Sequence, residues 1–208
     1  MGKVLVHATV SLDGYLAGPD ASVDQPLGEG GMRLHEWVFH RPAHETDEAV
    51  IAELFATTGA VVLGRRTFEV GVGAWEDTPY PAPSFVLTHQ PRENLVMASG
   101  TFTFVTGGAG EALRRARAAA GDRDVTLMGA DVSRQYLLAG HVDEVHLQLA
   151  PVLLGGGTRL FDGLADAGVT LERTRVLESP LVTHLRYAVR RPVAPDPPVR
   201  AARDWSDA

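Results

Sequence analysis

The stretch Val62-Leu63-Gly64-Arg65-Arg66-Thr67-Phe68-Glu69 decides how this chain is interpreted. A short buried strand, predicted over Ala60–Leu63, runs into a glycine, two arginines and a hydroxyl at the start of a predicted helix. Backbone N–H groups and the helix dipole favour an anion at such a point, and arginine supplies a planar fork of donors. The pattern therefore indicates an anion site, although a surface turn with solvated arginines accounts for it equally well.

Strands and helices alternate on both sides of this stretch. Thr46 is expected to cap a helix that Gly59 ends, because hydroxyls suit helix starts and glycine suits helix ends. This alternation predicts a mostly parallel sheet with helices on both faces, a three-layer α/β sandwich. Strands are expected at Val4–Val10, Phe85–Thr88, Thr101–Thr106, Val125–Met128 and Val142–Leu149, and helices at Thr46–Thr58, Ala109–Ala120 and Asp131–Ala139.

The C-terminal part follows a different pattern. Arg173–Glu178 and Leu181–Val189 are joined through Ser179-Pro180, and the second segment alternates apolar residues with His184 and Arg186. A period of two predicts an antiparallel hairpin with one face in water. We expect a single domain over residues 1–191, and a flexible tail over 192–208 because of its prolines. Residues 18–45 read as a long loop with a short helix at 32–39.

Two further glycine segments lie at ligand-binding positions. Met128-Gly129-Ala130-Asp131-Val132-Ser133 joins a predicted strand to a helix, where open α/β sheets bind phosphates. A plain helix cap at Asp131 or Ser133 is the alternative. Gly155-Gly156-Gly157-Thr158-Arg159-Leu160-Phe161 implies a close backbone approach, either to a ligand or, more commonly, to another strand.

Composition excludes several classes of function. The 208 residues carry a net charge of −7, and their arginines are scattered, so we expect no nucleic-acid partner. The absence of cysteine excludes disulfides and thiolate chemistry. No apolar run approaches the ~20 residues that span a membrane, and Met1–Val10 lacks the features of a signal peptide. A cytoplasmic location is expected.

The histidine-rich segment His35-Glu36-Trp37-Val38-Phe39-His40 does not predict a metal centre. Its spacing departs from the HExxH zinc motif by one residue, so no metal site is expected. Trp37 and Trp75 are candidate walls of a flat substrate pocket, with core packing as the alternative for each.

The order of these motifs resembles the dihydrofolate reductase fold, and within it the reductase domain of the riboflavin-pathway deaminase–reductase. The resemblance covers roughly Lys3 to Arg190, and the order is more specific than any one motif. The motifs that carry it are Ser11-Leu12-Asp13-Gly14-Tyr15-Leu16-Ala17-Gly18, residues 62–69, Phe85-Val86-Leu87-Thr88-His89, Met128-Gly129, Val142-Asp143-Glu144-Val145 and residues 155–161.

The resemblance implies NADPH as cofactor. It places one group of residues at the adenosine 2′-phosphate, namely Gly64, Arg65, Arg66, Thr67, Thr88 and His89. It places Gly129, Ala130, Asp131, Val132 and Ser133 at the pyrophosphate, and Leu16, Ala17 and Gly18 beside the nicotinamide. The family pattern has a Gly-Gly pair where this chain has Gly129-Ala130, and Asp131 adds a negative charge next to a phosphate.

Reduction of a C=N bond also needs a proton, which a carboxylate or water must supply. The resemblance places the family's carboxylate at Glu48 or the adjacent Asp47, and Asp13 is a further candidate. Asp47 and Glu48 equally suit the first turn of a helix, and Asp13 suits a turn. The resemblance implies an NADPH-dependent reductase of a pterin- or pyrimidine-like heterocycle, acting as a homodimer. A non-catalytic ligand-binding protein on the same fold is the alternative.

Overall fold

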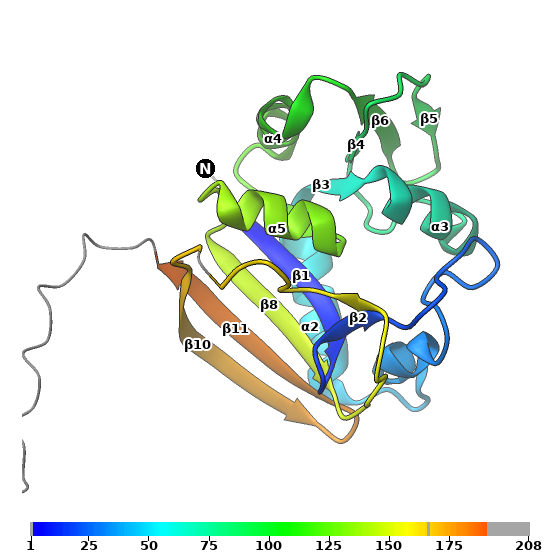
Figure 1. Cartoon of the computed structure of the whole chain (residues 1–208), viewed down its shortest axis with the longest axis vertical. Helices are drawn as coiled ribbons and strands as arrows, with labels where there is room; N and C mark the ends of the chain where they lie inside the picture. The colour runs from blue at the N-terminus through cyan, green and yellow to red at the C-terminus, as the bar shows by residue number, and fades with distance from the viewer. Residues whose placement is uncertain (1, 166, 191–208) are drawn as a thin grey trace, which may run out of the picture.

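Nine strands form one mixed sheet at the centre of the molecule (Figure 1). The computed structural model describes residues 2–165 and 167–190. Six neighbouring strands run parallel, whereas the strands at the two ends of the sheet are antiparallel. The spatial order is β10 (Thr170–Ser179), β11 (Val182–Arg190), β8 (Glu144–Ala150), β1 (Val4–Ser11), β7 (Asp124–Met128), β3 (Thr58–Gly64), β4 (Ser84–Leu87), β6 (Thr101–Val105) and β5 (Leu95–Val96).

Helices cover both faces of this sheet. Alternate residues of β3 pack into two different cores, with Val62 on one face and Val61 on the other. One core contains apolar residues of α4 (Gly108–Ala120) and α5 (Ala130–Leu138), and the other contains residues of α2 (Glu45–Thr57) and α3 (Arg65–Trp75). The predicted three-layer α/β sandwich with a mostly parallel sheet and a C-terminal hairpin is confirmed.

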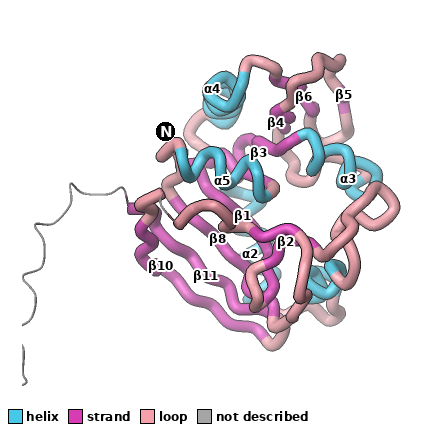
Figure 2. Tube along the Cα trace, viewed as in Figure 1, coloured by secondary structure: helices cyan, strands magenta, loops and turns pink. Residues whose placement is uncertain are grey.

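The central strands are buried because their residues are apolar on both faces. The first six residues of β3 are all buried, as expected for a parallel strand covered by helices on each side. Figure 2 shows the strands together as one twisted layer, with the hairpin of β10 and β11 forming one end of it.

The predicted helix at Thr46–Thr58 agrees with α2 to within one residue at each end, but both predicted end residues, Thr46 as cap and Gly59 as stop, were wrong. His44, not Thr46, caps the helix, and its Nδ1 accepts a hydrogen bond from the Thr46 N–H at 3.3 Å. Gly59 does not end the helix but lies inside β3, where an added Cβ would approach the Ala120 Cα to 2.8 Å. Gly59 thus serves the close packing of β3 on the end of α4.

The prediction that one face of the hairpin lies in water was also wrong, because α2 covers that face. His184 on β11 is 5% exposed, and its Nε2 lies 2.7 Å from Asp47 Oδ1 of α2. Arg186 donates to Glu53 Oε1 at 2.7 Å, also from α2. Polar residues at alternate positions meet polar groups of a helix here instead of water.

The long segment before α2 folds back over the end of β8. It contains a 3-10 helix (Gly31–His35) and the short α1 (Glu36–Phe39), consistent with the helix expected at 32–39. Leu34 packs on Ala150 and Val152.

A small antiparallel pair, β2 (Tyr15–Ala17) with β9 (Thr158–Arg159), lies outside the main sheet. The tail predicted over 192–208 lies outside the described residues. Within the described ranges, no helix is long and apolar enough to cross a bilayer.

Candidate functional site

Two helix N-termini meet at the carboxyl edge of the parallel sheet. Adjacent strands β3 and β7 end at Gly64 and Met128, and they lead into α3 and α5. Gly129 has φ +95°, and a Cβ added there would lie 2.4 Å from Thr67 Oγ1. A Cβ on Gly64 would lie 3.4 Å from Val132 Cγ2. The first turns of α3 and α5 are therefore in direct contact.

Both helix starts leave backbone donors free for a ligand. Gly64 and Gly129 are the N-cap residues, and no side-chain hydrogen bond caps either helix within the described residues. The first N–H groups of an α-helix have no partner inside the helix, and the dipole adds positive potential there. Two such ends side by side make a cradle suited to a phosphate-bearing ligand.

The arginine pair stands at the rim of this cradle. Arg65 donates to Glu69 Oε1 at 3.0 Å, one turn along α3, and both side chains are half exposed. Arg66 is exposed. An exposed arginine of this kind can exchange a surface carboxylate for a ligand phosphate, because surface ion pairs contribute little stability.

Asp131 points away from the cradle. Its carboxylate is 86% exposed and forms an ion pair with Arg134. Arg134 also donates to the carbonyl of Arg159 at 2.9 Å, so this pair is fixed on the outer side of α5. The negative charge that the sequence placed beside a phosphate is directed elsewhere, whereas Ser133 and Val132 are buried beneath the first turn.

Thr88 and His89 follow β4 at the same edge of the sheet. Thr88 is buried, and its Oγ1 accepts the N–H of Gln90 at 3.1 Å, so the hydroxyl shapes the turn. His89, the next residue along the chain, is exposed.

The loop predicted to contact the nicotinamide is built from close backbone contacts. Gly18 donates to the carbonyl of Leu27 at 2.8 Å, and Ala17 pairs with Thr158. Gly157 has φ +117°, and an added Cβ would lie 2.0 Å from the Ala17 carbonyl oxygen. The third glycine of the triplet therefore serves packing against β2, where Leu16 is half buried on the main core.

Asp13 ties the first loop to the glycine triplet. Its carboxylate accepts the N–H groups of Leu154 at 3.2 Å and Gly155 at 2.7 Å. A hydrogen bond from the Ser11 side chain, followed by these backbone N–H groups, lowers the pKa of Asp13 to about 2. Asp13 is therefore a carboxylate at neutral pH and orients the loop.

Asp47 and Glu48 are neighbours on α2 with opposite surroundings. Asp47 is 3% exposed and bonds His184, whereas Glu48 is exposed on the outer side of the helix. Trp37 is also buried, and its ring meets the His184 imidazole edge-on with centroids 5.2 Å apart. Sequence reasoning missed His184 because it belongs to the face that was expected to be wet.

Trp75 lies at the far end of α3 from the cradle. Its ring stacks on Phe102 with centroids 6.4 Å apart and covers Gly71. Trp75 therefore has the alternative role given to it in the sequence analysis, which is core packing. In the part of the chain that the structure describes, no three His, Asp or Glu side chains come together as a metal site.

Comparison with known families assigns the chain. The model of the RibD C-terminal domain matches residues 2–184. The chain belongs to this family. A relative, the uncharacterized protein YwjB of Bacillus subtilis (strain 168), is 26% identical over 168 residues, 79% of this chain and 85% of that protein.

Solved structures similar to this RibD C-terminal domain protein share its fold. A putative riboflavin biosynthesis protein from Shewanella sp. PV-4 has 22% identity and a TM-score of 0.69, covering 91% of this chain and 99% of that chain. A pyrimidine reductase-like protein from Corynebacterium diphtheriae has 18% identity and a TM-score of 0.61, with 92% and 93% covered. Dihydrofolate reductase from Enterococcus faecalis, complexed with NADP(H), has 15% identity and a TM-score of 0.57, with 91% and 98% covered. The expected dihydrofolate reductase-like fold and its branch are thus confirmed.

Proposed function

We propose that this protein is an NADPH-dependent reductase of a small, flat nitrogen heterocycle of the pterin or pyrimidine kind. The observation that carries the proposal is the contact between the two glycine-capped helix starts, where Gly129 fits against Thr67. A dinucleotide presents a pyrophosphate and, in NADPH, a 2′-phosphate. Such a ligand suits one anion cradle with an arginine pair beside it.

The residues at the carboxyl edge fit this cofactor. The first turn of α5, from Ala130 to Ser133, would hold the pyrophosphate. The N–H groups of Ala130, Asp131 and Val132 would be its donors, because the Ser133 N–H already donates to the Gly129 carbonyl at 3.1 Å. Arg65, Arg66 and Thr67 would hold the 2′-phosphate, with Thr88 and His89 beside them. Leu16, Ala17 and Gly18 would flank the nicotinamide, which supplies the hydride when the cofactor is bound.

Asp47 is the proposed holder of the proton. Asp13 is excluded from that role near neutral pH because its pKa is lowered to about 2, and Glu48 is exposed on the outer side of α2. Asp47 is buried and bonds the His184 imidazole at 2.7 Å. A carboxylic acid hydrogen-bonded to an imidazole can donate a proton to a substrate, and the imidazole can then pass another proton to the carboxylate.

The names of two similar structures support a heterocyclic substrate, one a pyrimidine reductase-like protein and the other a dihydrofolate reductase. Trp37, packed on His184, would bound the substrate end of the site. A homodimeric state and a cytoplasmic location are further proposals that rest on the family resemblance and the sequence.

A deuterium-transfer experiment tests this function. The protein is incubated with NADPH deuterated on the nicotinamide and with a panel of oxidised pterins and aminopyrimidines, and products are analysed by mass spectrometry. Deuterium in one product is expected, with a rate lowered about 100-fold in Asp47→Asn and unchanged in the neighbouring Glu48→Gln. NADPH binding without transfer to any of the panel would favour the non-catalytic binding protein instead.

A further inference from the structure

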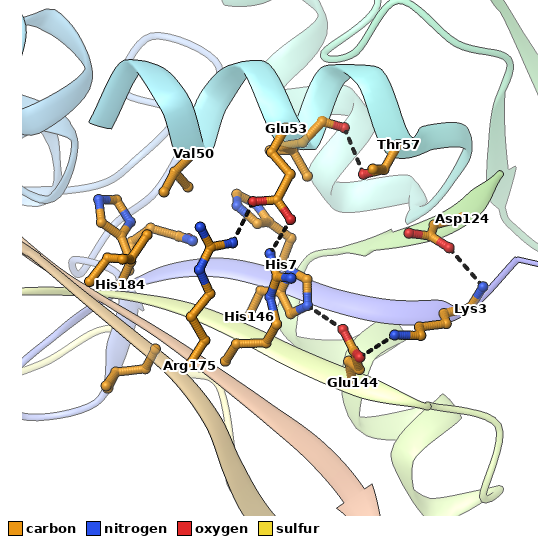
Figure 3. A pocket seen from close by; sticks show the side chains of 15 residues that line it. Lys3, His7, Val50, Glu53, Thr57, Asp124, Glu144, His146, Arg175 and His184 are labelled. Atoms are coloured by element: carbon orange, nitrogen blue, oxygen red, sulfur yellow. Dashed lines mark hydrogen bonds and ion pairs between the residues drawn. The ribbon is translucent and has the colours of Figure 1, made fainter. Parts of the chain in front are cut away.

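A pocket of about 240 Å³ lies beneath α2, against the strands β1, β8, β10 and β11 (Figure 3). Lys3 and Asp124 line one end of it, near the amino ends of β1 and β7. Arg186 lies opposite His146, further along β8. The cradle described above lies at the carboxyl ends of the parallel strands, so the arginine pair of this pocket and the cradle are separate.

Two arginines of this pocket share one carboxylate. Arg175 and Arg186 bond the two oxygens of Glu53, with N···O distances of 2.6 and 2.7 Å (Figure 3). Partial burial raises the pKa of Glu53, but the hydrogen bonds from Arg186 and Arg175 outweigh it, so the pKa is lowered overall and Glu53 is ionised. Two positive charges therefore meet one negative charge, and one positive charge is left over at this point of the pocket.

The neighbouring titratable groups do not cancel this surplus. Burial lowers the pKa of His7 to about 3 and also lowers the pKa of His146, and the charge of Arg186 adds to both effects. Both imidazoles are therefore neutral at pH 7. Asp47, on the same helix as Glu53, bonds His184 at 2.7 Å and neither of the two arginines.

The Lys3 end of the pocket has the opposite charge balance. Glu144 pairs with Lys3 Nζ at 2.5 Å. Asp124 adds a second carboxylate, whose Oδ1 accepts the backbone N–H of Lys3 at 2.8 Å. Because one lysine faces two carboxylates here, an anion is repelled from this end and attracted to the arginines. The pocket thus fixes the direction of a ligand that carries one negative charge.

Both guanidinium groups keep donors that a ligand can reach. Among the described residues each side chain donates a single hydrogen bond, to Glu53, and its other N–H groups remain available. The side chains of Arg175 and Arg186 are 42% and 27% exposed. Since both contact the same carboxyl group, they lie close enough together for one further anion to contact both. Arginine binds carboxylates well, because its planar fork matches their two oxygens.

We propose that this pocket binds a small monocarboxylate with an apolar body, and that Arg175 and Arg186 hold its carboxylate. Val50 and Leu54 of α2 and Leu177 of β10 line the pocket and supply apolar walls for the body of the ligand. Pockets for drug-sized ligands have ~300–1,000 Å³, so the smaller volume here suits a body of about one ring. The proposal assigns no role to the groups that handle the proton and does not depend on the cofactor.

Titration of the labelled full chain with benzoate, followed by amide NMR at constant ionic strength, tests this site. A Kd of about 1 mM is expected for a ligand this small, with shifts at α2 and at the hairpin of β10 and β11. Benzamide, which has the same shape without the charge, should bind at least about tenfold more weakly.

Three variants locate the carboxylate of the ligand. Glu53→Gln releases both arginines from the competing carboxylate and should tighten benzoate binding about fivefold. Arg175→Gln should weaken it at least about tenfold. Arg190→Gln is the matched control, because Arg190 lies on β11, pairs with Glu172 and does not line the pocket. It should bind benzoate as the wild type does.

Failure of the wild type to bind benzoate, equal binding of benzamide, or weaker binding in Glu53→Gln would overturn the proposal. An equal loss in Arg190→Gln and Arg175→Gln would also overturn it, since general surface charge would then account for the binding. Arg175→Gln carries the test if Glu53→Gln does not fold, because the Arg175 side chain is 42% exposed. NADPH titration of the same samples separates this proposal from the reductase function. Displacement of benzoate by NADPH would place the anion at the cradle and contradict the site proposed here.

Discussion

Replacing Gly129 with alanine tests the contact between the two helix starts. Gly129 has φ +95° and ψ 149°, a backbone conformation that residues with a side chain rarely adopt. Its added Cβ would lie 2.4 Å from Thr67 Oγ1, well inside van der Waals contact. The substitution therefore forces either the backbone of Gly129 or the first turn of α3 to move.

The expected loss of stability has two parts. The backbone strain costs ~1–3 kcal/mol, and the overpacking against Thr67 costs ~1–3 kcal/mol. Together they amount to about 4 kcal/mol, which corresponds to a fall in Tm of about 12 °C for a chain of this size. Gly121→Ala is the matched control, because Gly121 has φ +63° with nothing within 4 Å of an added Cβ. Because its ψ of −120° also lies in a region that residues with a side chain rarely adopt, this variant should show the strain cost alone, ~1–3 kcal/mol, without the overpacking.

Urea unfolding followed by circular dichroism gives these free energies. Thr67→Ala removes the clashing oxygen and leaves the Thr67 Cβ position at 3.5 Å, an ordinary contact. The double variant Gly129→Ala/Thr67→Ala should therefore recover about 1 kcal/mol or more, as a coupling in a double-mutant cycle. Equal costs for Gly129→Ala and Gly121→Ala, with no coupling to Thr67, would refute the close approach of α3 and α5.

Three further predictions concern buried or tied side chains. Asp13→Asn should lose stability relative to the wild type above pH ~4, and the difference should vanish as the pH falls towards 2 in urea unfolding, because the folded pKa is lowered from 3.8 to about 2. Asp47→Ala should cost about 2 kcal/mol, because it leaves the buried His184 N–H unpaired, whereas Glu48→Ala should change stability by less than about 0.5 kcal/mol. His7, whose pKa burial lowers from 6.5 to about 3, should show ¹⁵N shifts of a neutral ring down to pH ~4. Since the unfolded chain takes up that proton below pH 6.5, stability should fall with acid, and less so in His7→Gln.

The sequence predicted the parts of the fold that depend on local pattern. The Ala-rich helix ending at Gly121 and the strand that ends at Gly64 are found where the sequence placed them, because glycine and apolar runs act locally. The predicted end residues of α2 were wrong for two reasons. His44 and Thr46 are both able to cap a helix, and Gly59 packs against Ala120, which lies far along the chain. Local pattern does not show which neighbour a residue will meet.

The candidate site depends more heavily on such distant contacts. Asp47 and Glu48 are adjacent and equally acidic, and only the bond from His184, 137 residues away, distinguishes them. The direction of Asp131 is likewise set by Arg134, which in turn bonds the carbonyl of Arg159. The resemblance located the edge of the sheet, while packing decides which of its side chains face inward.

The most direct test of the central claim is a calorimetric titration of NADPH and NADH against wild type, Arg65→Ala and Arg115→Ala. Arg115 is the matched control, since it is an arginine on α4 paired with Glu111 at the same i,i+4 spacing as Arg65 with Glu69. The wild type should bind NADPH more tightly than NADH, and Arg65→Ala should weaken NADPH alone by about tenfold or more, with Arg115→Ala unchanged. Absence of binding by either nucleotide, or an equal loss for both in Arg65→Ala, would contradict the claim that this edge holds NADPH.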